Sequence, residues 1–181
     1  MGTLFYPRIS IGQQYQRQWP VYGRPAVTAS ADGRASPTRS FRGSVYDWWR
    51  QVVLDTFYEA GTPRRALQPV QDRLFDDLWH DFGRARHYAL YPDTLTTLQA
   101  LQAWPSASAS PVLGILSNVD ARIHVALRAL GIADYFHFVL CSEELGYEKP
   151  DRRAFEAALM RAHIDDPRDA LHVGDDYRRL P

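Results

Sequence analysis

The stretch Val112-Leu113-Gly114-Ile115-Leu116-Ser117-Asn118 decides the fold class. Its first five residues form a short apolar run after Pro111, and two polar residues follow, as is typical of a buried strand and its end. A helix should come next, because apolar residues recur every three or four positions at Val119, Ile123, Ala126, Leu127 and Leu130. We expect Asn118 to cap this helix and Gly131 to end it.

Two further apolar runs follow, Phe136 to Cys141 and Ala170 to Val173. Between them Asp151 should cap a helix whose apolar positions are Phe155, Ala158, Leu159 and Ala162. Three buried strands alternating with helices predict a parallel α/β sheet. Ligands of such sheets bind beyond the carboxyl ends of the strands, where Ser117-Asn118 and Asp175-Asp176 fall.

The middle of the chain is predicted to be helical. The apolar stripe of the first helix ends at Gly61-Thr62-Pro63 and consists of Val45, Trp48, Trp49, Val52, Val53, Thr56 and Phe57. The second stripe is Val70, Leu74, Leu78 and Phe82, widened by Phe75 and Trp79, and Asp93 should start a third helix with Leu95, Leu98 and Leu101. We interpret the aromatic stripes as packing between helices. Pro20 to Gly43 has no period and is rich in turn residues, so we expect loop or disorder there.

Composition narrows the function classes. The 181 residues are 45% hydrophobic, which favours one domain with a real core, and 21 basic residues balance 21 acidic ones. Zero net charge argues against a nucleic-acid or anionic-membrane binder. No run of about 18 apolar residues and no signal-peptide pattern is present. The single cysteine, Cys141, excludes an intrachain disulfide and fits a reducing compartment, so we expect a cytoplasmic location.

One imbalance concerns the basic residues, of which 20 are arginine and only Lys149 is lysine. A guanidinium substitutes poorly where a compact point charge is required, so a lone lysine is a candidate functional residue. Each polar motif has a common structural explanation by itself. Ser-Asn after a strand is usually a cap, Lys-Pro-Asp is often a turn, and adjacent aspartates are mostly solvated.

The order of these motifs suits phosphate chemistry. Ser117 and nearby backbone N–H groups could bind phosphate oxygens at a helix N-terminus. Lys149 would neutralise negative charge, and a carboxylate pair at Asp175 and Asp176 could hold Mg²⁺ through oxygen ligands.

In this order the motifs resemble those of the haloacid dehalogenase (HAD) superfamily. Leu116-Ser117-Asn118 matches the family's second motif, Glu148-Lys149-Pro150-Asp151 its third, and Val173-Gly174-Asp175-Asp176 its fourth. The opening Gly2-Thr3-Leu4-Phe5 matches the tail of the first motif, Asp-x-Asp-Gly-Thr-Leu.

The resemblance implies a Rossmannoid parallel sheet with helices on both faces and an inserted α-helical cap. The α/β core would comprise residues 1–9 and 89–181, and the cap residues 10–88, with 20–43 as loop or disorder. The implied reaction is Mg²⁺-dependent hydrolysis of a small phosphorylated substrate through a phospho-aspartate. No particular oligomeric state is implied.

The resemblance also implies roles for single residues. Lys149, Ser117 and Thr3 would be catalytic, with Asn118 joining Ser117 and Lys149 in substrate binding. Mg²⁺ would be held by two metal-binding residues, Asp175 and Asp176.

Two departures from the family pattern bear on activity. The nucleophilic aspartate would fall two residues before Met1, and Arg179 and Leu180 stand where another acidic residue is usual. We therefore expect a chain truncated at both ends and inactive, because no phospho-aspartate can form without the nucleophile. The alternatives are a non-catalytic HAD-like binding protein or a truncated gene product. A phospho-acceptor receiver domain is disfavoured, because there the acidic pair precedes the lysine.

Overall fold

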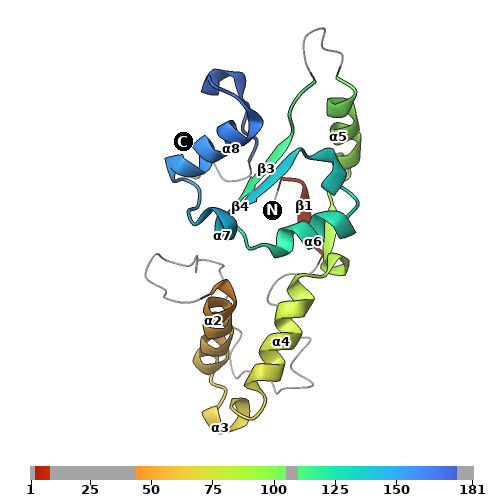
Figure 1. The fold of residues 1–181 in the computed structure, drawn as a ribbon. Coiled ribbons are helices and arrows are strands. Elements are labelled where there is room, and N and C mark those ends of the chain that lie inside the picture. Colours follow the sequence, from red (N-terminus) through yellow and green to blue (C-terminus); the bar gives the residue numbers. More distant parts are fainter. Residues whose placement is uncertain (1–2, 9–43, 105–109, 175–181) are drawn as a thin grey trace. The chain divides into compact units, whose positions relative to one another are not determined.

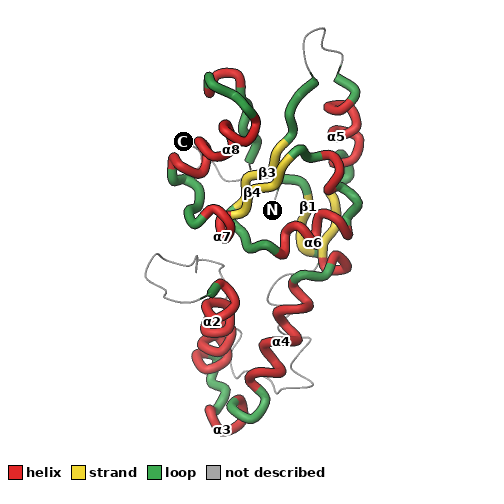
Figure 2. The backbone as a smooth tube through the Cα atoms, in the orientation of Figure 1, coloured by secondary structure: helices red, strands yellow, loops and turns green. Residues whose placement is uncertain are grey.

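The computed structural model describes residues 3–8, 44–104 and 110–174, which Figure 1 and Figure 2 show as ribbon and tube. The chain forms two compact units. Residues 1–8 and 83–181 make one, called here the α/β unit, and residues 9–82 make the other, called the helical unit. The predicted loop at Pro20 to Gly43 lies outside the described residues, as do Asp175 and Asp176.

The helical unit contains α2 (Val45–Glu59), α3 (Arg64–Leu67) and α4 (Gln71–Phe82). A capping box starts α2: the Ser44 hydroxyl accepts from the Asp47 amide, and the Asp47 carboxylate accepts from the Ser44 amide. The Ser44 hydroxyl also donates to the Asp47 carboxylate at 2.7 Å, and this hydrogen bond, followed by that of the Ser44 amide, lowers the pKa of the Asp47 carboxyl. Both predicted helices are thus confirmed.

The core of the helical unit is built from the predicted stripes. Its buried side chains are Val53, Leu54, Phe57, Leu67, Leu74, Phe75 and Leu78. The Tyr46 ring lies 4.8 Å from that of Phe75, edge to face, and its hydroxyl donates to Asp76 at 2.6 Å. The aromatic residues therefore pack between helices, as the sequence predicts.

The α/β unit is organised around β3 (Gly114–Ser117) and β4 (Phe138–Cys141), which pair in parallel. They are joined through α6 (Arg122–Ala129) and a 3₁₀ turn, η2 (Ala133–Tyr135). Gly114 lies opposite Phe138, and a Cβ at position 114 would overlap that phenyl ring, so a larger residue there requires the ring to move. The predicted strand–helix–strand organisation of an α/β fold is confirmed.

The start of α6 differs from the prediction. The helix begins at Arg122, and its N-cap residue, Ala121, makes no side-chain capping bond. Asn118 is not the cap, because its side chain bonds to another segment, described below. The predicted end is correct: Gly131, with φ +71°, adopts the left-handed conformation that follows many helices.

The remaining elements enclose the core of the α/β unit. β1 (Phe5–Pro7) pairs antiparallel with β2 (Tyr88–Leu90), which follows η1 (Ala85–His87). The helical elements α5 (Thr94–Gln102), α7 (Ser142–Leu145), α8 (Arg152–Ala162) and η3 (Pro167–Asp169) complete the unit. The core side chains are Phe5, Tyr88, Leu98, Ile115, Ile123, Ala126, Leu127, Ile132 and Cys141. In Figure 1, α8 lies on one side of the β3–β4 pair, and α5 and α6 lie on the other.

The third predicted strand, Ala170 to Val173, is wrong. These residues form no strand, and Leu171 and Val173 are 90% and 66% exposed. An extended segment needs a neighbouring strand to satisfy its N–H and C=O groups, and none of the described strands pairs with this one.

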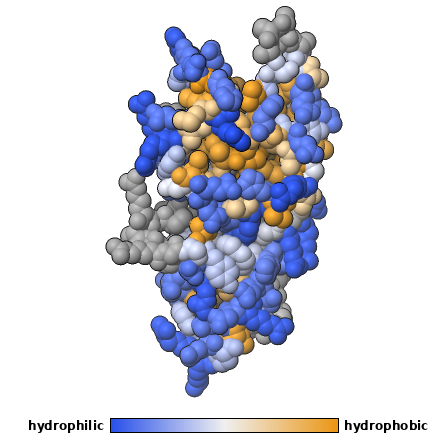
Figure 3. All heavy atoms as spheres, in the orientation of Figure 1, coloured by the Kyte–Doolittle hydropathy of each residue, from blue (hydrophilic) through white to orange (hydrophobic). Residues whose placement is uncertain are grey.

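Figure 3 shows apolar side chains gathered on the surface over β3 and β4.

None of the helices in the described part of the chain combines the length and the apolar character needed to cross a membrane.

Candidate functional site

Ser117 is the last residue of β3 and Cys141 is the last residue of β4, and the two lie opposite each other in the parallel register. This edge is where ligands of parallel sheets bind. The Ser117 side chain is half-buried, and within the described residues no hydrogen bond to its hydroxyl is formed. A hydroxyl in this state can donate to a ligand oxygen.

Asn118 bonds to the backbone of Lys149, 31 residues further along the chain. Its amide Nδ2 donates to the Lys149 carbonyl at 2.7 Å, and its Oδ1 accepts from the Lys149 amide at 2.8 Å. We call this pair of hydrogen bonds the Asn118 clamp. It fixes the Lys149 backbone against the residue that follows β3. One N–H of the Asn118 amide is outside the clamp, since the group carries two.

The Lys149 side chain turns back to the same strand. Its Nζ donates to the Leu116 carbonyl at 2.8 Å, so the ammonium lies at the carboxyl end of β3, beside the peptide that joins Leu116 to Ser117. The peptide bond from Lys149 to Pro150 is cis. Next in the chain, Asp151 caps α8 by accepting from the Arg153 amide at 3.0 Å, as predicted.

The structure therefore brings three predicted residues, Ser117, Asn118 and Lys149, to one edge of the β3–β4 pair. The spacing of these residues in the sequence does not by itself require them to lie together. They do so because the parallel connection from β3 to β4 returns the chain to the same edge, and because the Asn118 clamp holds Lys149 there. The predicted roles of these residues stay predictions.

His172 is a neighbour of this site that the sequence analysis did not single out. Burial, and next the positive charge of Lys149, lower the pKa of its imidazole. Its ring packs edge to face on Phe155 of α8, with centroids 5.6 Å apart. Its sequence position was the available clue, because it is the titratable residue of Ala170 to Val173, directly before Gly174. The segment leading to Asp175 thus passes close to Lys149.

The other predicted site residues are not joined to this group. Thr3 is exposed and precedes β1, where the Leu4 carbonyl accepts from the Thr94 hydroxyl at 2.8 Å. Within the described residues, no hydrogen bond links Thr3 to Ser117 or Lys149. The positions of Asp175 and Asp176 are not described, but two carboxylates are the hard oxygen donors that Mg²⁺ prefers, so their chemistry fits that ion.

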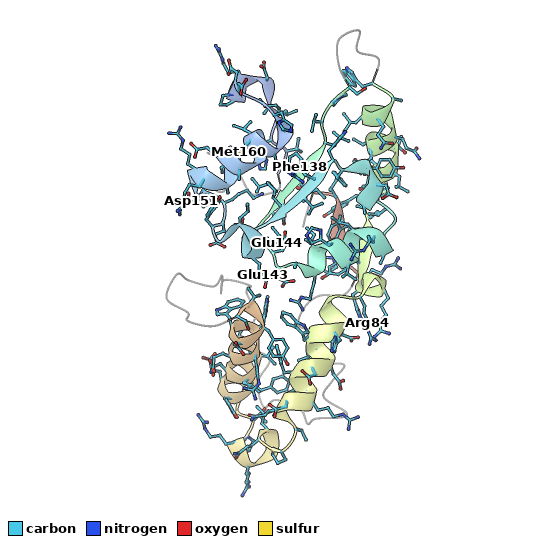
Figure 4. All side chains as sticks on the ribbon, viewed as in Figure 1. Arg84, Phe138, Glu143, Glu144, Asp151 and Met160 are labelled. Carbon is cyan, nitrogen blue, oxygen red and sulfur yellow. The ribbon has the colours of Figure 1, made fainter. Side chains whose placement is uncertain are left out.

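The loop that carries Asn118 into α6 is held by α7. The Ser142 hydroxyl donates to the Val119 carbonyl at 3.2 Å, and the Glu143 carboxylate accepts from the Ala121 amide at 2.7 Å. Glu144 is the other acidic residue of this turn, and Figure 4 labels both. These contacts fix the loop between β3 and α6, so that a hydroxyl, an amide and an ammonium are presented together. Such a set can bind an oxyanion.

Comparisons with known proteins agree on one family. A profile described as haloacid dehalogenase-like hydrolase matches residues 7–181. Haloacid dehalogenase-like hydrolase domain-containing protein 3 of Mus musculus is 38% identical over 131 residues, 72% of this chain. That match spans 48% of the mouse protein, about half its length. The protein of the same name from Danio rerio is 31% identical over 187 residues, covering 97% of this chain and 74% of the zebrafish protein.

Solved structures share the fold. A HAD phosphatase from Thermococcus onnurineus superposes with a TM-score of 0.56 at 19% identity, covering 99% of this chain and 75% of that one. A HAD-superfamily hydrolase, subfamily IA, variant 1, from Geobacter sulfurreducens PCA gives 0.58 at 20% identity, covering 91% and 70%. At these identities the likeness concerns the fold alone. It confirms the predicted α/β Rossmannoid class.

Proposed function

This chain belongs to the haloacid dehalogenase-like hydrolase family, and from that premise we propose that its α/β unit serves Mg²⁺-dependent hydrolysis of phosphate esters. Family membership supports hydrolysis, and the phosphate ester is our inference from the site. One observation carries it: the only lysine of the chain places its Nζ 2.8 Å from the Leu116 carbonyl, at the residue before Ser117.

In this proposal Ser117 and Lys149 hold the phosphoryl group. The Ser117 hydroxyl donates to one oxygen, and the Lys149 ammonium offsets negative charge on the others. Asn118 keeps the lysine backbone in place through the clamp. An arginine is a poor replacement for Lys149, because a planar guanidinium cannot occupy the same point beside the strand end.

Asp175 and Asp176 are the proposed holders of Mg²⁺, which when bound would offset charge on the transferring phosphoryl group. The proposed nucleophile is an aspartate two residues before Met1 in the family pattern, and no aspartate precedes Gly2 in the 181 residues. Hydrolysis by the family's mechanism needs that carboxylate, because the phosphoryl group is transferred to it. The alternative is a non-catalytic HAD-like binding protein.

Two coarser features are part of the proposal. The inserted α-helical cap of the family would correspond to residues 10–88, which include α2, α3 and α4, although residues 83–88 belong to the α/β unit. The substrate would be a small phosphorylated molecule. The single cysteine, which is a buried free thiol, supports a reducing compartment such as the cytoplasm.

The test is hydrolysis of p-nitrophenyl phosphate with and without Mg²⁺. It compares the 181-residue chain with a version extended N-terminally by an apolar strand that ends in Asp-x-Asp before Gly2. We expect turnover from the extended version only, and only with Mg²⁺. Lys149→Arg in that version should lower kcat/KM by roughly 100-fold or more, as loss of a stabilising donor does, whereas Arg128→Lys on the exposed face of α6 should not.

Two results would overturn the proposal. One is a folded extended version, verified by circular dichroism, that releases no p-nitrophenol. The other is a Lys149→Arg variant that hydrolyses the ester as well as its parent. The first result would favour the binding protein.

A further inference from the structure

Three metal-binding side chains from three different elements meet beside the end of β4. They are His124 of α6, Cys141 at the end of β4, and Glu144 of α7. One imidazole nitrogen, the Sγ and one carboxylate oxygen all lie within 4.8 Å of one another. Figure 4 labels Glu144 on α7.

The separations are close to those that a tetrahedral cation imposes. His124 Nε2 lies 3.1 and 3.3 Å from the two Glu144 oxygens. Ligand atoms bound to one Zn²⁺ at about 2.0–2.3 Å in a tetrahedron are roughly 3.3–3.8 Å apart. The widest separation in the group therefore has to shrink by only about 1 Å.

The backbone that carries these ligands is held in place without them. Glu143, the neighbour of Glu144, accepts from the Ala121 amide at 2.7 Å, and Ser142 donates to the Val119 carbonyl at 3.2 Å. Both contacts fix α7 against the loop that leads into α6. A cation would thus meet a site whose three supporting elements are already in position.

The exposure of the three side chains and the chemistry of their donor atoms also suit a bound cation. Cys141 is fully buried, whereas the side chains of His124 and Glu144 are 31% and 46% exposed, so a cation can approach from the surface. A thiolate, an imidazole and a carboxylate together suit Zn²⁺ and not Mg²⁺, which takes oxygen ligands. Three protein ligands leave the fourth position of a tetrahedral cation to water.

We propose that His124, Cys141 and Glu144 form a binding site for a thiophilic divalent cation such as Zn²⁺. The site uses neither of the proposed Mg²⁺ ligands, Asp175 and Asp176, and does not depend on the proposed hydrolysis. Without a cation, His124 Nε2 lies within hydrogen-bond distance of the Glu144 carboxylate, beside the buried thiol of Cys141.

Cobalt titration of the full 181-residue chain tests this site, because Co²⁺ bound to a thiolate has a charge-transfer band in the near ultraviolet. The chain has one cysteine, so any such band reports Cys141. We expect the band to saturate at one equivalent of Co²⁺ and to be abolished by Zn²⁺.

Substitutions separate a three-ligand site from a lone thiol. His124→Gln and Glu144→Gln, at partly exposed positions, should each weaken Co²⁺ binding at least about 10-fold, the loss typical even of a group that only supports a ligand. Glu143→Gln is the matched control, since this neighbouring carboxylate is bonded to Ala121 and should leave the affinity unchanged. Circular dichroism of each variant verifies the fold.

The proposal fails if the folded chain develops no thiolate band at any Co²⁺ concentration. It also fails if the band is insensitive to both His124→Gln and Glu144→Gln, or if Glu143→Gln weakens binding as much as Glu144→Gln.

Discussion

Two segments of the α/β unit have the same sequence pattern and different structures. Residues 112–118 and residues 170–176 are both short apolar runs that end in polar residues. The first forms β3, pairs with β4 and is followed by the Asn118 clamp. The second, as far as Gly174, forms no strand and leaves Leu171 90% exposed.

The two segments differ in the elements that pack against them and not in their own hydrophobicity. Ile115 is 9% exposed and belongs to the core cluster that includes Ile123 and Leu127 of α6, and its strand pairs with β4. Leu171 has comparable hydrophobicity but no described strand beside it. An apolar run thus predicts a tendency to be buried, and the rest of the chain decides whether burial occurs.

The largest predicted contrast is between Ile115→Ala and Leu171→Ala. Removing the buried Ile115 side chain should lower the free energy of unfolding by about 2–5 kcal/mol through lost burial and a cavity. Removing the exposed Leu171 side chain should change it by less than about 0.5 kcal/mol. Urea unfolding measures both. Similar losses for the two variants would mean that residues 170–174 are packed in solution.

Next comes a pair of glycines. Gly114→Ala forces a Cβ into the Phe138 ring and should cost about 1–3 kcal/mol of unfolding free energy through overpacking. Gly174→Ala brings its Cβ to 3.3 Å from His172 Nε2 and 3.9 Å from His172 Cδ2, a contact that a small rotation of that side chain relieves. Thermal unfolding of the two variants, side by side, checks the prediction. Full tolerance of Gly114→Ala would mean that the Phe138 ring moves aside without cost.

An effect no larger than this is expected at the clamp. Asn118→Ala removes two hydrogen bonds to the Lys149 backbone and should cost about 1–3 kcal/mol, given a net worth of about 0.5–1.5 kcal/mol for each. Hydrogen exchange at the Lys149 amide should accelerate, because Oδ1 of Asn118 is its acceptor. Asn118→Asp keeps that acceptor, so its Lys149 amide should stay better protected than in Asn118→Ala. Unchanged exchange in both variants would contradict the clamp.

The smallest effect concerns pH. Burial and the Lys149 charge lower the pKa of His172, so the folded chain favours the neutral imidazole. Its contribution to stability is complete above the usual pKa of 6.5 and is lost as the pH falls from there through the lowered value. The unfolding free energy should therefore decline less steeply below pH 6.5 in His172→Gln than in the parent chain.

Lys149→Met sharpens this point. It should raise the His172 pKa part of the way towards 6.5, because burial, the larger cause, remains. Proton NMR of the imidazole measures the change. An unmoved pKa would mean that Lys149 does not lie beside the segment 170–174.

Much of this architecture could be predicted because it depends on local patterns. The stripes of α2 and α4 follow from periodicity, and the end of α6 follows from the conformational freedom of Gly131. The antiparallel pairing of β1 with β2 was not predicted, since each strand has three residues and too few positions for a pattern. The failure at 170–173 has the same origin: strands depend on distant partners.

The residues of the candidate site could be predicted from the sequence, but the hydrogen bonds between them could not. The order of Ser117, Lys149 and the aspartates indicated that they belong together. The role of Asn118 was not visible, because a residue after a strand is usually a helix cap, and the alternative bond reaches Lys149 across 31 residues. The meeting of His124, Cys141 and Glu144 likewise depends on how α6 and α7 pack at the end of β4.

The central claim is that the edge formed by Ser117, Asn118 and Lys149 binds a phosphoryl group. Titration of the 181-residue chain with inorganic phosphate, followed by amide chemical shifts, tests it most directly. We predict saturable shifts at these three residues that disappear in Lys149→Met. Shifts confined to the chain's many arginines, or shifts at Ser117 and Asn118 that persist in Lys149→Met, would contradict the account.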